Sequence, residues 1–414
     1  METAGYDTIV VGAGFAGAVA ARELAERGGE KVLVLESRDH VGGNCYDEPD
    51  RYGILVHVYG PHIFHTNSER AYKYLSRFTD WIDYSHEVVA RVGDEEIPVP
   101  FNLNTLRQVF PEDADELEAL LVSTFGEGAR VPILKLREAE DERLRKIADY
   151  VYQNIFLKYT MKQWGKKPEE IDPSVSGRVP VVISHDDRYF QDRWQGMPKD
   201  GYTALFEKML DHEGITVKTG VDAHDRISID GDKIWVDDAL FSGEAGAGVD
   251  RPAGGDAGLV AERHMSEFRG RIIYTGLPDE FFDCRFGRLP YRSLKFDVEH
   301  VDKDRFQSHA VVNYTVSEDF TRISEFKLMT GQEELSGTTI MREYPFAYTG
   351  GEGEIPYYAI NNPENDALYA RYKELADQAG VILLGRLAEY KYYNIDAIVD
   401  HALEVADGLI GADR

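Results

Sequence analysis

The fold of this chain is decided by the stretch YDTIVVGAGFAG, residues 6–17. An apolar run leads into the pattern Gly-x-Gly-x-x-Gly at Gly12, Gly14 and Gly17, and a stretch of helical character follows. In a βαβ unit the first glycine permits the tight turn, the second lets backbone N–H groups approach a pyrophosphate, and the third lets helix and strand pack closely. A second apolar run ends in Glu36, whose carboxylate suits the ribose hydroxyls of an adenosine. The segment therefore predicts a dinucleotide-binding Rossmann unit.

The residues after Glu36 favour FAD over NAD as the dinucleotide. Residues 37–44 read SRDHVGGN, which puts a basic side chain and a glycine pair where the chain would pass the pyrophosphate and approach an isoalloxazine. A NAD-binding fold has less need of the second glycine pair, although an ordinary loop between strand and helix stays an alternative for this segment. The motif residues predicted to bind the cofactor are Gly12, Gly14, Phe15, Gly17, Glu36, Ser37, Arg38, Gly43 and Asn44.

Length and charge limit the class of protein. The chain has 414 residues, where one domain usually has ~100 to 200, so several domains are expected. Its net charge of −28 would repel phosphate backbones and anionic lipid surfaces, which argues against nucleic acid as a partner. An anionic substrate therefore requires a few arginines within a pocket, where they locally overcome the surrounding negative charge.

Cysteine content and hydropathy indicate a protein of a reducing compartment. Cys45 and Cys284 are the only cysteines, and neither lies in a Cys-x-x-Cys motif. Cys45 is expected to be a small buried side chain rather than a redox centre. No basic and apolar signal precedes Tyr6, and no run approaches the ~18 apolar residues that span a membrane. We therefore expect a cytoplasmic protein without membrane insertion, and no metal site is predicted.

The order of segments predicts an α/β fold whose domains are built from non-adjacent parts of the chain. A hairpin is expected over Val88–Pro100, and helical spacing occurs in Asp113–Phe125 and Leu144–Trp164. Residues 165–180 predict a loop, and Gly243–Gly258 predicts a flexible insertion. The predicted division is a Rossmann-like FAD-binding domain at 1–85, 196–270 and 346–414, a helical substrate-binding domain at 101–177 with a mobile loop at 165–180, and an antiparallel sheet domain at 86–100, 178–195 and 271–345.

The C-terminal end predicts a second contribution to the flavin site. Val381–Gly385 reads as a buried strand, and Asn394 is a good N-cap for a helix that runs to about Leu409. A helix N-terminus directed at the flavin would stabilise negative charge and favour the anionic reduced form. A helix that only covers the Rossmann sheet is compatible with the same residues and stays an alternative.

Aromatic and basic residues outside the dinucleotide unit are candidates for substrate binding. At the end of a predicted helix, Tyr159 and Trp164 could form a stacking surface for a nucleobase. Arg178, near Tyr189, and Arg292 provide two guanidinium groups for a diphosphate. Core packing of the aromatic residues and a surface position of the two arginines stay alternatives.

Taken together, these motifs resemble the bacterial type of the UDP-galactopyranose mutase family. The similarity covers nearly the whole chain apart from the glycine-rich stretch at 243–258, and it is strongest in HVYGPHIFHT, residues 57–66. The combination of motifs makes the match specific. The other segments that carry it are 12–17, 38–44, 159–165, 189–193, 291–294 and 385–396.

The resemblance implies an FAD-dependent isomerase that interconverts UDP-galactopyranose and UDP-galactofuranose without net redox change and supplies galactofuranose for cell-surface glycans. In the family's mechanism the flavin is reduced, and its N5 attacks the anomeric carbon as UDP leaves. The sugar ring then opens through an iminium intermediate and closes on the other hydroxyl. The resemblance also implies a cytoplasmic homodimer that depends on an electron donor for flavin reduction.

The resemblance assigns a catalytic set by position. Arg178, on the predicted mobile loop, and Arg292 match two arginines that grip the diphosphate. His62 and His65 match histidines that line the flavin face. These four residues are the predicted catalytic set, and His62, Arg386 and Asn394 are added to the predicted cofactor contacts.

The resemblance assigns the substrate contacts in the same way. Tyr159 and Trp164 match the uridine-binding pair, and Tyr189 and Tyr392 match tyrosines that bind the phosphates. The full predicted substrate-binding set is His86, Phe156, Tyr159, Thr160, Trp164, Arg178, Tyr189, Arg292, Tyr392 and Asn394.

Two positions depart from the pattern of the family, and a third, His86, differs from some of its members. Asn394 stands where many bacterial members carry Asp, which weakens a general-acid role but keeps hydrogen bonding to flavin or sugar. Phe320 stands where the family commonly has a phosphate-binding Tyr, so one phosphate contact is in doubt. His86 lies where some members carry Asn near the sugar, and we expect it to contact galactose.

Two other function classes stay open from the sequence. An FAD-dependent oxidoreductase of the amine-oxidase type begins with the same Rossmann and Arg-x-x-x-Gly-Gly pattern, although Tyr159–Gly165 argues against it. A non-catalytic flavin or nucleotide-sugar binder is the other class. Turnover of a UDP-hexose separates both from the mutase.

Overall fold

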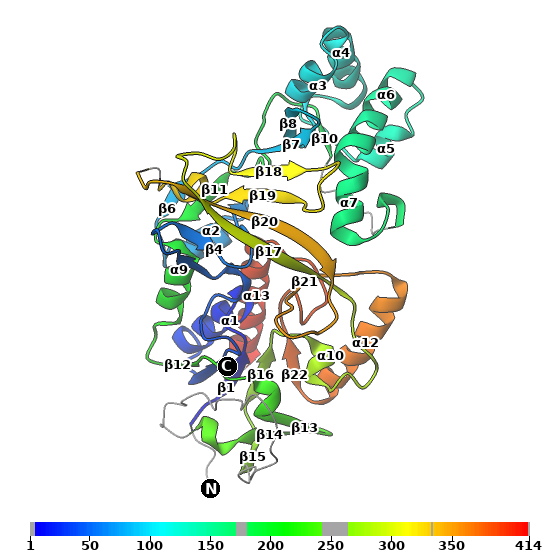
Figure 1. Cartoon of the computed structure of the whole chain (residues 1–414). Coiled ribbons are helices and arrows are strands. Elements are labelled where there is room, and N and C mark those ends of the chain that lie inside the picture. Colours follow the sequence, from blue (N-terminus) through cyan, green and yellow to red (C-terminus); the bar gives the residue numbers. More distant parts are fainter. Residues whose placement is uncertain (1–4, 171–179, 242–263, 333, 413–414) are drawn as a thin grey trace.

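The computed structural model describes residues 5–170, 180–241, 264–332 and 334–412. Three parts follow one another along the molecule in Figure 1: a Rossmann part at the bottom, a long sheet across the middle and a group of helices at the top. Within the described ranges, no helix is long and apolar enough to cross a membrane.

The motif at residues 6–17 forms the centre of a five-stranded parallel sheet. Its middle strands are fully buried, as expected for a parallel sheet covered on both faces. The strands, in spatial order, are β12 (Ile215–Lys218), β2 (Val32–Leu35), β1 (Thr8–Val11), β16 (Arg271–Tyr274) and β22 (Val381–Leu383).

Helices cover both faces of this sheet because its residues alternate between two cores. Val10 and Val34 face the core that α1, α9 and α13 cover, whereas Ile9 and Leu33 face the core that α10 and α12 cover. α1 packs on both α9 and α13. The bounds are α1 (Phe15–Glu26), α9 (Gly201–Leu210), α10 (Pro278–Phe281), α12 (Pro363–Gln378) and α13 (Ile395–Ala412).

Short strands and one helix lie outside the two large sheets. β13, β14 and β15 form one small sheet, β5, β11 and β6 form another, and β3 pairs with β4. The bounds are β13 (Ile227–Asp230), β14 (Lys233–Asp237), β15 (Met265–Phe268), β5 (Phe64–Thr66), β11 (Trp194–Pro198), β6 (Trp81–Asp83), β3 (Asp47–Pro49), β4 (Leu55–His57) and α2 (Glu69–Leu75).

A seven-stranded sheet crosses the middle of the molecule (Figure 1). All neighbouring strands are antiparallel except β18 and β7, which are parallel. The strands, in spatial order, are β21 (Pro356–Ala359), β17 (Tyr291–Val301), β20 (Thr338–Ala347), β19 (Arg322–Glu325), β18 (Val311–Tyr314), β7 (Val88–Val92) and β8 (Glu95–Val99), and the short helix α11 (Lys327–Thr330) follows β19.

The helical part packs around its own core at the end of this sheet. A capping box between Asn102 and Thr105 starts its first helix. Before α7 the chain makes a π-helical turn at Tyr152–Phe156, a feature that is frequent at functional sites. The bounds are α3 (Leu103–Val109), α4 (Ala114–Phe125), α5 (Ile133–Arg137), α6 (Glu142–Val151) and α7 (Leu157–Trp164), with the paired strands β9 (Arg130–Val131) and β10 (Val181–Val182).

The predicted hairpin and helices are confirmed, whereas three domain boundaries are wrong. β16 pairs with β1 and belongs to the Rossmann sheet, so the antiparallel domain does not start at residue 271. β21 pairs with β17, although 346–414 was assigned to the Rossmann domain. β10 pairs with β9 in the helical part rather than with the long sheet. Short apolar strands carry no mark of their partner, which long-range packing decides.

Two predicted segments fall on parts of the chain that the structure does not describe. Residues 171–179 of the predicted mobile loop and the predicted insertion at Gly243–Gly258 lie outside the described residues.

Candidate active site

A cleft of about 370 Å³ lies where β1 and β2 end and contains almost the whole predicted cofactor motif. Such a position, at the carboxyl ends of parallel strands, is where doubly wound sheets bind nucleotides. The predicted residues that line it are Gly12, Gly14, Phe15, Glu36, Ser37, Arg38, Gly43, Asn44, His62, Arg386 and Asn394.

The glycines of the motif are required by close approaches of the backbone. Gly12 has a φ of +102°, and a Cβ there would lie 2.0 Å from Oγ1 of Thr275. A Cβ on Gly17 would lie 2.0 Å from the carbonyl oxygen of Gly12, so Gly17 serves helix packing and does not line the cleft. A Cβ on Gly43 would lie 3.1 Å from Cα of Gly14. The backbone of Gly12, Gly14 and Gly43 therefore lines the cleft directly.

The polar groups of the cleft fit an adenine dinucleotide. Glu36 is buried, and its carboxylate accepts hydrogen bonds from the backbone N–H of Ala13 at 2.8 Å and of Arg38 at 3.0 Å. Arg38 donates through Nη2 to Oδ1 of Asn44, while its Nη1 is buried without a partner among the described residues. α1 starts at Phe15 without a side-chain cap, so its first N–H groups can bind a pyrophosphate. The buried Nη1 of Arg38 and the uncapped helix both suit FAD.

A second cavity of about 460 Å³ opens onto the far end of the cleft. The two share His62, Arg386, Asn394 and Ile395 as lining residues. Asn394 is at the N-cap position of α13, because its carbonyl accepts the N–H of Ile398 at 3.1 Å. The predicted substrate residues that line this cavity are His86, Tyr159, Tyr189, Tyr392 and Asn394. His65, predicted with His62 as a catalytic residue on the flavin face, lines this cavity and not the cofactor cleft.

His62 is fixed as a neutral imidazole at the junction. Its backbone N–H donates to Nδ1 of the buried His57 at 3.0 Å, and its own Nδ1 lies 2.8 Å from the carbonyl oxygen of Gly60. A carbonyl only accepts, so Nδ1 carries the proton and Nε2 is an acceptor. Burial lowers the pKa of His62 to about 3. The ring therefore stays uncharged at neutral pH.

His65 and His86 are held in the second cavity by different partners. His65 stacks on Phe190 with ring centroids 3.5 Å apart, and its Nδ1 lies 2.6 Å from a carboxylate oxygen of Asp192. His86 is buried, with Nδ1 at 3.0 Å from the hydroxyl of Tyr84. Burial lowers the pKa of His86 to about 3, so it is a neutral group in this cavity.

A third, smaller pocket of about 180 Å³ lies beside the second cavity and contains the predicted uridine residues. The positions 156, 159, 160 and 163 follow helical spacing, so one face of α7 and the turn before it provides them. Gln163 is one residue that the sequence reasoning missed, and its Oε1 is buried without a partner within the described chain. The lining residues on this face are Phe156, Tyr159, Thr160, Gln163 and Trp164.

Two predicted or questioned phosphate contacts do not line these cavities, and a third, Arg178, lies outside the described residues. Arg292 is buried, and it donates to the carbonyl oxygens of Gln163 at 2.8 Å and Lys162 at 3.1 Å, which caps the end of α7. Phe320 packs edge-on against Tyr314 and is absent from the lining of all three cavities. The diphosphate roles of Arg178 and Arg292 stay predictions.

Arg322 is another residue that the sequence reasoning missed. It lines both the second cavity and the small pocket, and it forms an ion pair with the buried Glu343 at 2.7 Å. No pattern in the sequence distinguishes this arginine from the other basic residues, of which the chain has 46 in all.

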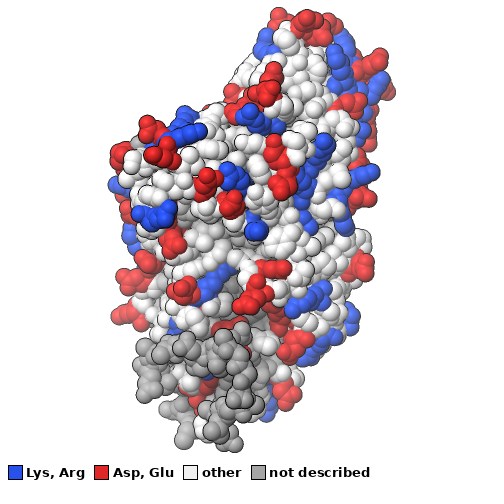
Figure 2. All heavy atoms as spheres, in the orientation of Figure 1, with Lys and Arg blue, Asp and Glu red and all other residues white. Residues whose placement is uncertain are grey.

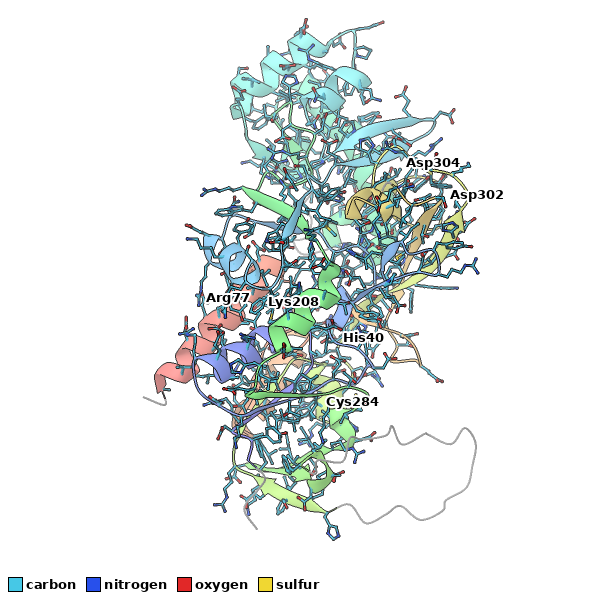
Figure 3. All side chains as sticks on the ribbon, turned by 90° about the vertical axis from the view of Figure 1, so that its left-hand side faces the viewer. His40, Arg77, Lys208, Cys284, Asp302 and Asp304 are labelled. Atoms are coloured by element: carbon cyan, nitrogen blue, oxygen red, sulfur yellow. The ribbon has the colours of Figure 1, made fainter. Side chains whose placement is uncertain are left out.

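The cysteines show no sign of redox function. Cys45 is buried beside the cofactor cleft, as predicted, and burial raises the pKa of its thiol to about 12. Cys284 lies on the Rossmann part, below His40 in the view of Figure 3, and both cysteines are free thiols. The described residues contain no group of three or more side chains that could hold a metal ion.

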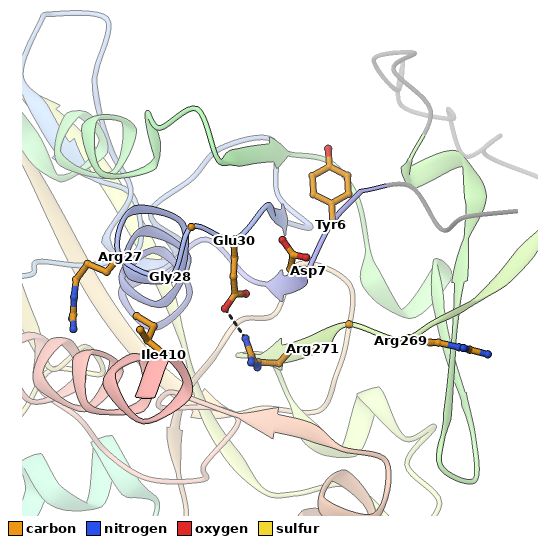
Figure 4. Close-up of a pocket in the computed structure, with 10 residues that line it drawn as sticks. Tyr6, Asp7, Arg27, Gly28, Glu30, Arg269, Arg271 and Ile410 are labelled. Carbon is orange, nitrogen blue, oxygen red and sulfur yellow. Dashed lines mark hydrogen bonds and ion pairs between the residues drawn. The ribbon is translucent and has the colours of Figure 1, made fainter. Parts of the chain in front are cut away.

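A large open hollow of about 790 Å³ lies at the opposite end of β1 (Figure 4). It is the amino-terminal end of the strand, where doubly wound sheets do not bind their ligands. Three of its charged groups already have partners: Arg271 pairs with Glu30 at 2.9 Å, and the carboxylate of Asp7 accepts the backbone N–H of Lys31 at 2.8 Å. We assign no function to this hollow.

The surface charge agrees with a small-molecule site inside an acidic protein. Figure 2 shows acidic and basic side chains interspersed over the visible face, without a broad basic patch there. The arginines that line the cleft and the two cavities next to it are Arg38, Arg130, Arg322 and Arg386.

The fold and the cleft define the class of FAD-binding enzymes with a Rossmann unit. Two family models match: one described as "NAD(P)-binding Rossmann-like domain" at residues 10–78, and one described as "UDP-galactopyranose mutase" at residues 154–392. The chain belongs to the UDP-galactopyranose mutase family, whose members are isomerases. Family membership favours the isomerase over the oxidoreductase alternative.

Two relatives and one solved structure support this membership. The chain is 34% identical over 408 residues to a Klebsiella pneumoniae protein named "Probable UDP-galactopyranose mutase", covering 98% of this chain and 94% of the relative. It is 33% identical over 403 residues to an Escherichia coli "dTDP-fucopyranose mutase", covering 96% and 97%. A crystal structure of a reduced UDP-galactopyranose mutase shares the fold with a TM-score of 0.69 at 14% identity, covering 98% and 94%.

Proposed function

We propose that this enzyme interconverts UDP-galactopyranose and UDP-galactofuranose without net redox change, with its FAD in the reduced state. The observation that carries the proposal is the junction at His62, Arg386 and Asn394, where the cofactor cleft opens into the second cavity. A sugar in that cavity lies at one end of the cofactor cleft. Glu36, whose carboxylate is assigned to the ribose of the adenosine, lies at the other end. The small pocket on the other side leaves room for a nucleoside.

When it is bound and reduced, FAD would supply the nucleophile for the anomeric carbon, and the complete reaction would leave the flavin in the reduced state. The chain supplies charge and orientation. The N-terminus of α13 at Asn394 and Ile395 directs its partial positive charge at the junction, where it stabilises an anionic reduced flavin. Neutral His62 offers Nε2 as an acceptor for a substrate hydroxyl.

His65 has the geometry of an oriented acceptor in the sugar cavity. The carboxylate of Asp192 only accepts, so Nδ1 of His65 donates to it and Nε2 accepts when the ring is neutral. The stacked ring of Phe190 restricts its rotation. We assign His65 to the sugar hydroxyls together with His86.

The small pocket on α7 suits a pyrimidine nucleoside. Phe156, Tyr159 and Trp164 provide aromatic faces for stacking, which contributes about 1–3 kcal/mol per base in comparable sites. The buried Oε1 of Gln163 is an acceptor without a partner among the described groups, and an imide N–H of uracil would satisfy it. Uracil and thymine both carry this N–H, so the pocket is compatible with UDP and with dTDP.

The family resemblance also supports proposals about the compartment, the oligomeric state, the electron donor and the metabolic role of the enzyme. We propose that the enzyme is a cytoplasmic homodimer, that an electron donor reduces its FAD, and that it supplies galactofuranose for cell-surface glycans. We also propose the division into an FAD-binding domain, a helical substrate-binding domain and an antiparallel sheet domain, with the boundaries corrected above. Arg178 and Arg292 are assigned to the diphosphate, which requires Arg292 to release the end of α7 when substrate binds.

An activity assay with chemically reduced enzyme tests the proposal. Purified protein is incubated with UDP-galactofuranose, with and without dithionite, and the products are separated by chromatography. We expect UDP-galactopyranose only after reduction. A parallel assay with dTDP-fucopyranose, chosen because of the Escherichia coli relative, tests the second candidate substrate. The proposal would be contradicted if reduced, flavin-loaded enzyme did not convert the UDP-sugar. If it converted the dTDP-sugar alone, the dTDP-sugar would be the substrate in place of the UDP-sugar.

A further inference from the structure

Residues 385–394 connect β22 to α13 and form a loop that lines both the cofactor cleft and the second cavity. Arg386 and Asn394 line both spaces, and Tyr392 lines the second cavity. The guanidinium carbon of Arg386 lies 4.5 Å from the centroid of the Tyr392 ring. Nη2 of Arg386 donates to the carbonyl oxygen of Tyr393 at 2.8 Å. The position of Arg386 therefore depends on the conformation of the whole loop.

A single carboxylate joins the start of this loop to its end. Oε2 of Glu389 accepts the backbone N–H of Gly385 at 2.7 Å, and Oε1 accepts the hydroxyl of Tyr393 at 3.0 Å. Oε1 also lies 3.0 Å from Nε2 of His401 on α13, which connects the loop to the helix. The Glu389 side chain is only 20% exposed, so these bonds are partly shielded from water.

The backbone in the middle of the loop has a conformation that a bulky residue rarely adopts. Tyr390 has a φ of +50°. Its ring is buried, and its hydroxyl donates to the carbonyl oxygens of Pro290 at 2.6 Å and Ile360 at 3.2 Å. A residue keeps such a φ only where its surroundings fix it, and these positions concentrate at functional sites. The loop is therefore fixed at its middle by Tyr390 and at its two ends by Glu389.

We propose that Glu389 is a positioning residue, which holds Arg386 and the N-terminus of α13 at the junction of the cofactor cleft and the second cavity. Glu389 is absent from the described lining of both spaces, so it acts through the loop and not by contact with a ligand. The charge of Arg386 and the partial positive charge of the helix N-terminus both stabilise an anionic reduced flavin. Both effects depend on distance, so a loosened loop weakens them. This assignment rests on the proposed function and deepens it.

The sign of the effect separates positioning from the charge of Glu389 alone. Removal of a carboxylate charge near the flavin favours the reduced anion, because one repulsive charge is lost. Loss of the bonds at the two ends of the loop has the opposite effect, since Arg386 and α13 are then no longer held. Glu389→Gln removes the charge and keeps both bonds, because its carbonyl can accept from Gly385 and its amide can donate to the hydroxyl of Tyr393. Glu389→Ala removes the charge and the bonds together.

The test measures the anaerobic redox equilibrium between the bound FAD of each purified variant and a reference dye. We expect the equilibrium constant for flavin reduction to fall about 10-fold in Glu389→Ala, and to equal or exceed that of the parent in Glu389→Gln. Both variants should keep the parent FAD content, because the end of the cleft at Glu36 is not altered. Glu404→Ala is the matched control, since this carboxylate is 68% exposed and lies 3.9 Å from Nδ1 of the same His401. The control should have the parent equilibrium constant.

Turnover by reduced enzyme gives a second measurement. Glu389→Ala should lower kcat with UDP-galactofuranose about 10-fold. The dissociation constant of UDP should change less than about twofold, because the nucleoside pocket on α7 is not altered. A fall in kcat without weaker UDP binding separates positioning at the flavin from a general loss of structure.

Other results would overturn the assignment. A higher equilibrium constant in both Glu389 variants would mean that Glu389 acts through its charge alone, and an unchanged value in Glu389→Ala would mean that the loop is fixed without it. If Glu389→Ala does not retain FAD, Tyr393→Phe decides, because it removes one of the two bonds. We then expect a fall of about threefold, and no change would contradict the proposal. Parent enzyme that isomerises no nucleotide sugar would overturn the proposed function, while the dye equilibrium would still report on Glu389.

Discussion

The cofactor half and the substrate half of the site are built in opposite ways. The cofactor cleft is formed mainly by backbone whose conformation depends on residues close in sequence. Gly12, Gly17 and Glu36 all belong to one βαβ unit. The substrate cavities use side chains from distant segments: α7 provides Tyr159, and β19 provides Arg322. Backbone recognition leaves a short, regular pattern in the sequence, whereas a composite pocket does not. The two halves should therefore respond differently to substitution.

The largest expected effect breaks the cofactor half at Gly12. Gly12→Ala forces a Cβ to within 2.0 Å of Thr275 at a positive φ, so we expect the purified variant to carry less than about 5% of the parent FAD, in line with a loss of several kcal/mol. The ratio of absorbance at 450 nm to that at 280 nm measures this. Gly29→Ala is the matched control, because Gly29 also has a positive φ but has no atoms within 4 Å of its Cβ position. Full flavin content in Gly12→Ala would show that the turn is not needed for binding.

An intermediate effect concerns the buried histidines His57, His62 and His86. Burial lowers their pKa values to about 4, 3 and 3, below the ~6.5 of an unfolded chain. The unfolded state then binds more protons, so the stability they contribute is present above about pH 6.5 and is lost as pH falls toward 3 to 4. At pH 5 each of these histidines lowers the free energy of unfolding by up to about 2 kcal/mol relative to neutral pH.

Thermal unfolding between pH 7.5 and 5 measures this dependence. His57→Gln should lower the slope of Tm against pH, because one of the three protonation sites is gone. An unchanged slope in His57→Gln would mean that His57 is not a source of the pH dependence.

Much of the cofactor half could be predicted from the sequence, and less of the substrate half. The glycines act through local sterics, so their spacing alone located the cleft. β16 was misplaced because a short apolar strand is compatible with either sheet, and pairing with β1 decides its place. Arg322 was missed because its significance comes from Glu343 on the next strand and from two cavities. A sequence pattern cannot express that arrangement.

The smallest expected effect sharpens the substrate half at Phe320. Phe320→Tyr restores the residue that the family commonly has, but this side chain packs against Tyr314 and Tyr344 and lines none of the three described cavities. We expect the affinity for UDP, measured by calorimetry, to change by less than about twofold, within the ±0.5 kcal/mol of a neutral substitution. A tenfold gain would place the diphosphate within reach of residue 320, before the start of β19.

The central claim is that the flavin acts in an isomerisation that leaves it reduced. The most direct test follows flavin absorbance at 450 nm under anaerobic conditions while reduced enzyme converts an excess of UDP-galactofuranose. The account predicts that absorbance stays low while each flavin supports many turnovers. Reoxidation of the flavin with about one product formed per flavin would contradict the account and would identify an oxidoreductase.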